Sequence, residues 1–313
     1  MVVMFFGTPR FALPTLQHLL DSSHTVAGVV TQPDRPRGRG QRVTFAPVKA
    51  LAVVRDVPVI QPDRLKPPEV ADTLRAWNAD VGVVAAYGRI IPEHLLSVPS
   101  LGMINVHASL LPKYRGAAPV HRAVLNGDAE TGVTIMRVVK ELDAGPMLAK
   151  ATRPIGPDET SDVVEEALAL LGAQLLITVL DRMVTDGAHE EPQDDSQATY
   201  APRLTKEEGL IDWSQPAAAI HNRVRGLYPW PHAYTYLHGA RLIVLQSRIA
   251  DLRGPRRLPQ GTVTHVTTEA IHVSTGEGEL AVIQLQPEGR RAMAVHDFIQ
   301  GHHVAVGDTF SLS

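Results

Sequence analysis

The sequence predicts an α/β protein with a Rossmann-like, doubly wound, mostly parallel sheet, followed by a small C-terminal OB-like β-barrel. Over residues 1–187, short apolar runs alternate with helical patterns, which is typical of parallel βαβ units. Residues 188–205 are polar and acidic with two prolines, which indicates a linker. Residues 206–313 contain about five short strand-like runs separated by Gly or Pro clusters, which is typical of a small barrel.

Each element of the first domain follows from its own pattern. Residues 2–6 form a continuous apolar run, the mark of a strand buried on both faces. The turn after it contains one glycine, Gly7, and does not match the G-x-G-x-x-G fingerprint, so we expect no dinucleotide site. The same criteria predict strands over 26–30, 57–60, 81–86, 103–106 and 132–139, and helices over 11–20, 46–55, 69–78, 120–125 and 160–184, with a short helix from 92.

The second domain shows shorter elements. Its pattern predicts helices over 212–225 and near 296–299, and strands over 233–237, 241–244, 261–265, 271–274 and 280–285. The most apolar segment of the chain lies earlier, over 167–180, but it is interrupted by Gln174 and Thr178. Because a membrane span needs about 18 apolar residues or more, we expect a buried helix there and no membrane contact.

Composition excludes several classes of protein. The net charge of −3 argues against general binding of polyanions, so a nucleic-acid role would need local basic patches. The absence of cysteine excludes disulfides, thiolate nucleophiles and Cys-ligated metal. The N-terminus has no basic region before its short apolar run, so we expect no signal peptide and a cytoplasmic protein. No spacing of histidines and carboxylates fits a metal site, and none is predicted.

The stretch from Leu101 to Val120 carries the strongest chemical signal. Asn105 and His107 lie two residues apart near the end of a predicted strand, so their side chains share one face. Strand ends of open α/β sheets are where ligands bind. The amide can donate to a developing oxyanion, and the imidazole can move a proton near neutral pH. The alternative is structural: Asn105 caps a turn, and His107 is a satisfied, partly buried histidine.

Two motifs favour the chemical interpretation. The run G-M-I-N-V-H-A-S-L-L-P (102–112) resembles the signature of the folate-dependent formyltransferases, and E-L-D-A-G-P-M-L (141–148) resembles the segment that supplies their catalytic aspartate. The resemblance implies the catalytic residues Asn105, His107 and Asp143. It also implies 10-formyltetrahydrofolate as the formyl donor, with a folate site lined by Ser109, Leu110, Leu111 and Pro112.

An arginine-rich loop and the second domain point to a particular branch of this family. Four arginines fall within eight residues, Arg35, Arg37, Arg39 and Arg42, although an arginine-rich composition or a solvated loop would also explain them. The loop, L-T-K-E-E-G-L-I-D-W (204–213) and V-R-G-L-Y-P-W-P (224–231) resemble the members that act on tRNA. The resemblance implies initiator methionyl-tRNA as the acceptor, contacted by this loop and by Lys206, with a tRNA-binding barrel over 206–313.

The implied reaction leaves some points open. From residue 205 on, ten Lys and Arg are balanced by ten Asp and Glu, so the tRNA contacts of the second domain are not localised by charge. The role of His107, as proton shuttle or as oxyanion stabiliser, is also open. The alternative acceptor is a small amine or an amino-sugar nucleotide, which would need neither the arginine loop nor the second domain. We expect the protein to act as a monomer.

Overall fold

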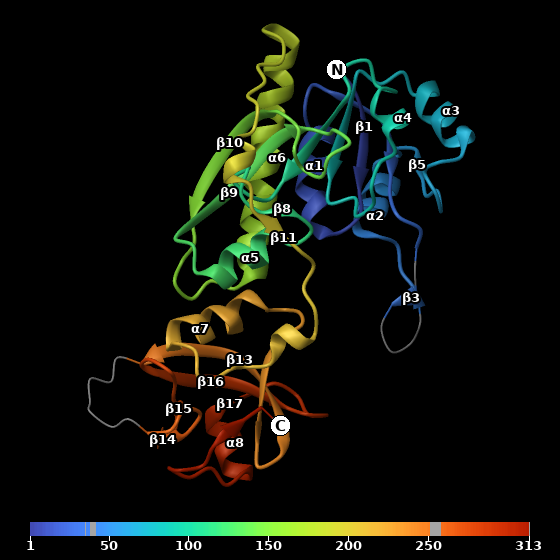
Figure 1. Ribbon diagram of the computed structural model, residues 1–313. Helices are drawn as coiled ribbons and strands as arrows, with labels where there is room; N and C mark the ends of the chain where they lie inside the picture. Colours follow the sequence, from blue (N-terminus) through green and yellow to red (C-terminus); the bar gives the residue numbers. More distant parts are fainter. Residues whose placement is uncertain (35, 38–41, 251–257, 313) are drawn as a thin grey trace. The chain divides into compact units, whose positions relative to one another are not determined.

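The computed structural model describes residues 1–34, 36–37, 42–250 and 258–312. The chain divides into two compact units (Figure 1). The first unit comprises residues 1–119, 130–153 and 165–201, and the second comprises residues 120–129, 154–164 and 202–313. The second unit thus includes two segments from the region expected to belong to the first domain. The expected boundaries at residues 187 and 205 remain a prediction.

The first unit is built on a seven-stranded sheet with the order β10-β9-β7-β6-β1-β2-β5. Its parallel part consists of β1 (Val2–Gly7), β2 (Thr25–Val30), β5 (Val59–Ile60), β6 (Val81–Ala85) and β7 (Met103–His107). At the other edge lie β9 (Glu130–Arg137), which is antiparallel to β7, and β10 (Met147–Pro154). The predicted mixed α/β fold with a mostly parallel sheet is confirmed.

The strand order places a switch point in the middle of the sheet. From β1 the chain winds to β2 and β5 on one side, then returns to β6 and β7 on the other. In open α/β sheets, ligands bind outside the carboxyl ends of the strands at such a point. The carboxyl end of β7, which carries His107, lies beside β6 and therefore borders this region.

The apolar runs of the sequence form the buried centre of the sheet. Phe6 in β1 packs edge-to-face on the ring of Tyr87, and both belong to a cluster with Leu74 and Leu95. These two leucines come from α3 (Pro68–Ala76) and α4 (Glu93–Leu96), which cover this face. Fully burying one such side chain contributes about 1.5–3 kcal/mol. Before residue 130, the described residues also form the α-helices α1 (Leu13–Leu20), α2 (Pro47–Val54) and α5 (Pro119–Asn126).

The long helix α6 (Ser161–Thr185) begins and ends within one residue of the prediction. It is long and apolar enough to cross a membrane by length and composition alone, a test that core helices of soluble proteins also pass. In this structure Leu168 is completely buried. A Cβ atom at Gly172 would lie 2.7 Å from the Val106 side chain and 3.1 Å from that of Val133. The helix therefore packs closely on β7 and β9, and glycine permits this approach.

The second unit contains a curled antiparallel sheet with the order β14-β15-β16-β13-β12-β18. Val263 N donates to Asp308 O at 2.8 Å, and Phe310 N donates to Gly261 O at 2.8 Å, so the stretch around β18 is joined to the start of β14. The elements are α7 (Ala217–Gly226), β12 (Ala233–Leu237), β13 (Ala240–Ala250), β14 (Val263–Val266), β15 (Ile271–Ser274), β16 (Glu279–Pro287), β17 (Met293–Ala294), α8 (Val295–Gly301) and β18 (Phe310–Ser311).

Helix α7 is tied to the segment before α6, which belongs to the same unit. His221 on α7 is buried, and its Nε2 lies 3.0 Å from the carbonyl oxygen of Pro157. Because a carbonyl only accepts, Nε2 carries the hydrogen, and in the neutral ring Nδ1 accepts from the Ser247 hydroxyl at 3.0 Å. Burial lowers the pKa of His221 from its ordinary value, so the fold holds a neutral imidazole.

This buried histidine predicts a loss of stability in weak acid. Histidine in the unfolded chain titrates near 6.5, above the pKa of folded His221. The stabilisation is therefore fully present above pH 6.5, and it is lost as the pH falls below 6.5 toward the lower pKa of the folded state. Thermal unfolding between about pH 7 and pH 5.5 should show a shallower pH dependence in His221→Gln than in the wild type. The exposed His303→Gln serves as control, and equal slopes for His221→Gln and the wild type would contradict the prediction.

Candidate active site

β7 ends with two polar side chains on one face of the sheet. Asn105 and His107 are two residues apart in the strand, so they point the same way, as predicted from their spacing. Asn105 is half-buried, and no hydrogen bond joins its amide to another residue in the described part of the chain. The amide can therefore donate to a ligand at the carboxyl end of β7.

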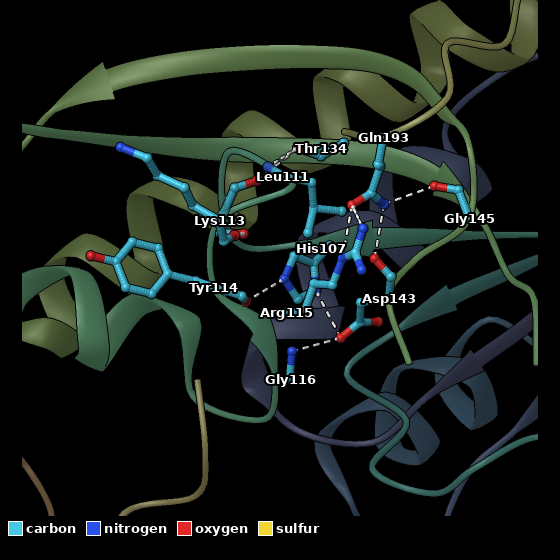
Figure 2. A network of polar contacts seen from close by, with 11 residues as sticks. His107, Leu111, Lys113, Tyr114, Arg115, Gly116, Thr134, Asp143, Gly145 and Gln193 are labelled. Atoms are coloured by element: carbon cyan, nitrogen blue, oxygen red, sulfur yellow. Dashed lines mark hydrogen bonds and ion pairs between the residues drawn. The ribbon is translucent and has the colours of Figure 1, made fainter. Parts of the chain in front are cut away.

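His107 is buried, and its two ring nitrogens have different neighbours. Nε2 lies 3.0 Å from the carbonyl oxygen of Tyr114, so Nε2 carries a hydrogen and donates it (Figure 2). Nδ1 faces Oδ2 of Asp143 at 3.7 Å, which is longer than a direct hydrogen bond. One nitrogen thus fixes the ring, as the structural interpretation of a buried histidine expects, and the other is directed at a carboxylate.

Asp143 lies in the loop between β9 and β10 and completes the arrangement. Its carboxylate oxygen Oδ2, which faces His107, also accepts from the backbone N–H of Gly116 at 2.8 Å. Gly116 has a φ of +123°, and a Cβ atom there would lie 2.8 Å from the carbonyl oxygen of Ala201. Glycine is therefore required for this N–H to reach the carboxylate.

The turn after β7 contains the residues that were predicted to line a folate site, and two of them form hydrogen bonds that stabilise it. Ser109 is completely buried and donates its hydroxyl to a backbone carbonyl at 2.6 Å. Leu111 is also buried, and its N–H donates to the Thr134 hydroxyl at 3.1 Å. Leu110 and Pro112 are half-buried and retain exposed surface. Within this segment, a ligand would therefore meet these two side chains and backbone groups rather than the Ser109 hydroxyl.

The structure describes only some of the residues that were predicted to contact tRNA. Arg35 and Arg39 lie outside the described residues. Arg37 and Arg42 lie in β3 (Pro36–Arg37) and β4 (Arg42–Val43), and they are direct partners across this antiparallel pair. Lys206 is exposed in the second unit, immediately before a short 3₁₀ turn. Their contacts with RNA remain predictions.

Two residues that no sequence motif marks support the Asp143 loop, Gln193 by direct contact and Arg115 through Gln193. Gln193 donates to the backbone carbonyl of Asp143 at 2.8 Å, and the guanidinium of Arg115 donates to Gln193 (Figure 2). Arg115 is buried. Gln193 lies in a polar stretch without a motif, so its role depends on a tertiary contact that no local pattern indicates.

The arrangement combines an unengaged amide, an imidazole and a carboxylate. The amide can stabilise an oxyanion, and the imidazole and carboxylate can accept and relay a proton. Within the described ranges, no group of three or more histidine, aspartate or glutamate side chains is placed to hold a metal ion. The site thus has the donors and acceptors that acyl transfer to an amine requires.

Comparisons with known proteins define the class. The family model described as "Formyl transferase" matches residues 1–180, and "Formyl transferase, C-terminal domain" matches residues 203–303. Among solved structures, the chain is similar to WlaRD, a sugar 3N-formyl transferase crystallised with dTDP and 5-N-formyl-THF. That match has a TM-score of 0.68 at 16% identity and covers 93% of this chain and 99% of that one. The two family models place this chain in the class of formyl transferases.

Relatives in sequence define the branch within this class. The methionyl-tRNA formyltransferase of Trichlorobacter lovleyi is 48% identical over 305 residues, which cover 97% of this chain and 95% of that protein. The methionyl-tRNA formyltransferase of Solibacter usitatus is 46% identical over 304 residues, covering 97% and 96%. The chain belongs to the methionyl-tRNA formyltransferase family.

Proposed function

We propose that this protein transfers the formyl group of 10-formyltetrahydrofolate to the α-amino group of methionine esterified to initiator tRNA, for translation initiation. The observation that carries the proposal is the set of Asn105, His107 and Asp143 at the carboxyl end of β7, in a chain related over nearly its full length to methionyl-tRNA formyltransferases. The proposal assigns every step to side chains and none to a metal ion.

The chemistry follows from these side chains. The neutral amine attacks the formyl carbon and gives a tetrahedral intermediate. Asn105 donates to the oxyanion, because its amide has no other partner among the described residues. His107 and Asp143 accept the proton that the amine loses and pass it to the folate nitrogen as the C–N bond breaks. The acceptor is thereby formylated, and tetrahydrofolate leaves.

The geometry favours proton transfer over oxyanion stabilisation as the role of His107. Its Nε2–H is already donated to Tyr114 O, so it is not available to an oxyanion. Nδ1 of His107 faces Oδ2 of Asp143 at 3.7 Å. A proton bound to either atom would make that atom the donor and the other atom the acceptor. His107 therefore acts with Asp143, and Asn105 supplies the oxyanion contact.

The second unit is proposed to be an OB-like barrel that binds the tRNA. The joining of β14 to the stretch around β18 supports a closed barrel. Exposed Lys206 and the arginine loop would contact phosphates of the acceptor stem. Because the unit is nearly neutral, these contacts depend on individual side chains rather than on overall charge. We further propose that the protein acts as a monomer in the cytoplasm, without membrane attachment.

The base of the arginine loop supports this role. Asp34, just before the loop, forms an ion pair with Lys49 of α2, and Oδ1 of Asp34 accepts from the backbone N–H of Ala46 at 3.3 Å. Gln61 donates to the same carboxylate oxygen at 3.1 Å. The two ends of the loop are thus held together at the carboxyl side of the sheet, where a cationic segment can meet a polyanionic substrate.

Replacing Arg39 by alanine tests the loop. The plot of the logarithm of tRNA affinity against the logarithm of salt concentration should become less steep by roughly one unit, because one phosphate contact is lost. Formylation at low tRNA concentration should slow accordingly, while folate affinity stays the same. Binding of initiator tRNA across a salt series measures the slope. A slope and an affinity equal to those of the wild type would remove Arg39 from the interface.

A comparison of acceptors tests the function itself. Purified protein and a formyl donor labelled in the formyl carbon would be offered charged initiator tRNA, an amino-sugar nucleotide or glycinamide ribotide. We expect label in the tRNA only. Label in a small amine and none in the tRNA would establish the alternative, a formyltransferase of small amines.

A further inference from the structure

We propose that Gln193 is a positioning residue that holds the Asp143 loop in its reactive geometry. The inference rests on the proposed function and assigns a role to a residue in the stretch that sequence analysis treated as a linker. The reasons are the contacts of the Gln193 side chain, the burial of its partner Arg115 and the backbone conformation of Asp143.

The Gln193 amide is fully engaged, and its two ends contact different parts of the site. Its NH₂ group donates to the carbonyl oxygens of Asp143 and Gly145, both at 2.8 Å (Figure 2). Its oxygen accepts from Nε of Arg115 at 3.0 Å and from Nη2 of Arg115 at 2.8 Å. A side-chain amide has two donor hydrogens and two acceptor lone pairs, so this residue uses all of its capacity here.

Arg115 determines which way the amide faces. Its guanidinium has donors only, so it requires the oxygen of Gln193 on its side and directs the NH₂ group to the loop. Arg115 is 4% exposed, which makes these hydrogen bonds costly to lose. Its ion pair with Asp195, at 2.7 Å, joins a side chain that is 81% exposed and contributes little by comparison.

The loop needs such support because of its backbone. Asp143 has a φ of +49°, in the left-handed region that non-glycine residues adopt at a cost. The two hydrogen bonds from Gln193 fall on the carbonyls of this residue and of Gly145, on either side of the turn. Without them, the turn could relax and carry the carboxylate away from Nδ1 of His107, which it faces at 3.7 Å.

The neighbours of Gln193 in the sequence fix other parts of the same site. Glu191 and Met147 exchange two backbone hydrogen bonds of 2.8 Å at the start of β10. The Thr199 hydroxyl accepts from the N–H of Tyr114, whose carbonyl holds His107. The segment continues into β11 (Tyr200–Ala201), which pairs in parallel with β8 (Arg115–Gly116), the strand that contains the glycine N–H donor to Asp143. Gln193 is therefore one point of a segment that frames the catalytic pair.

Gln193→Glu tests the role with little change of shape. The carboxylate still accepts from Arg115, but it cannot donate and would face two carbonyl oxygens, so the loop is released while Arg115 stays paired. We expect kcat for formyl transfer to fall by about 10- to 100-fold, since a small misplacement of a catalytic group costs this much. The KM values for donor and tRNA should stay near those of the wild type, because the Gln193 amide is fully engaged with protein groups and has no hydrogen-bonding capacity left for a substrate. Gln193→Met removes the donors without adding charge but also removes the acceptor of Arg115, so it should lower kcat at least as much.

The matched control is Gln197→Glu, in the same segment, where the exposed side chain donates to Asp194 and to no other residue among those described. It should keep wild-type kcat. A second measurement separates positioning from general destabilisation: the Gln193→Glu change is repeated in an Asp143→Asn background. If Gln193 acts through Asp143, the second change should lower kcat by less than about twofold there, because the effects of coupled residues do not add.

The outcomes are distinct. A loss in kcat that disappears in the Asp143→Asn background supports the inference. Wild-type kcat in both Gln193 variants would overturn it, and so would a loss of equal size in both backgrounds, while the proposed function would stand on the activity of the wild type. A wild-type protein that formylates no tRNA would overturn the proposed function together with the inference that rests on it.

Discussion

Replacing Asp143 by asparagine is expected to lower kcat by about 10²- to 10⁴-fold, the range of general acid–base contributions. The asparagine has the same size, and its oxygen can still accept from Gly116 N–H, so the loop keeps one of its contacts. It cannot take up a proton, and the pair with Nδ1 of His107 loses its charge. The proton released by the attacking amine then has no carboxylate to receive it, and the leaving folate nitrogen receives none from this site.

The change should appear in the chemical step rather than in binding. Single-turnover formyl transfer, with enzyme in excess over charged tRNA and with saturating donor, measures this step directly. Glu141→Gln makes the same chemical change at an exposed position of the same loop and should leave the rate unaltered. An Asp143→Asn enzyme within a few-fold of the wild type would remove the carboxylate from the reaction.

The second large effect is expected for Asn105→Ala. Removing one donor to a developing oxyanion typically costs about 10² to 10³ in rate. The amide is half-buried and has no hydrogen-bond partner among the described residues, so its removal breaks no hydrogen bond in that part of the fold and should leave thermal stability nearly unchanged. Unaltered affinity for tetrahydrofolate would show that the donor site is intact. Turnover that survives the change would mean that another group holds the oxyanion.

Much of the fold follows from local patterns in the sequence. The continuous apolar runs become β1 and β6 in the centre of the sheet, and the helix expected over 160–184 is α6. The edge strand β10 (Met147–Pro154) was missed, because its exposed and half-buried residues alternate and include Lys150 and Arg153. The antiparallel direction of β9 was also beyond reach, since a strand pattern does not indicate which way the strand runs.

Turns and helix starts depended on side-chain contacts. The helix expected from residue 212 begins at Ala217, because the carboxylate of Asp212 accepts from the backbone N–H of Ser214 at 3.0 Å and makes a turn there. Pro216 then precedes the first turn of α7. Arg115 and Gly116 form the short strand β8, which no local pattern predicts because its partner β11 is distant in sequence.

Part of the candidate site likewise follows from local sequence patterns, and part depends on tertiary contacts. The shared face of Asn105 and His107 follows from the period of a strand, and the choice of Asp143 came from a motif. The tautomer of His107 could not be predicted, since it depends on the carbonyl of Tyr114 seven residues away. Gln193 reaches Asp143 across 50 residues of sequence, and nothing in its polar surroundings marks it.

One measurement tests the central claim most directly. The wild-type protein and a donor labelled in the formyl group are offered charged initiator tRNA, charged elongator methionine tRNA and free methionine in parallel. The account predicts rapid labelling of the α-amino group on the initiator tRNA, little on the elongator and none on free methionine. Equal labelling of both tRNAs would contradict recognition of the initiator RNA. No label in either tRNA, with tetrahydrofolate still bound, would contradict the proposed acceptor altogether.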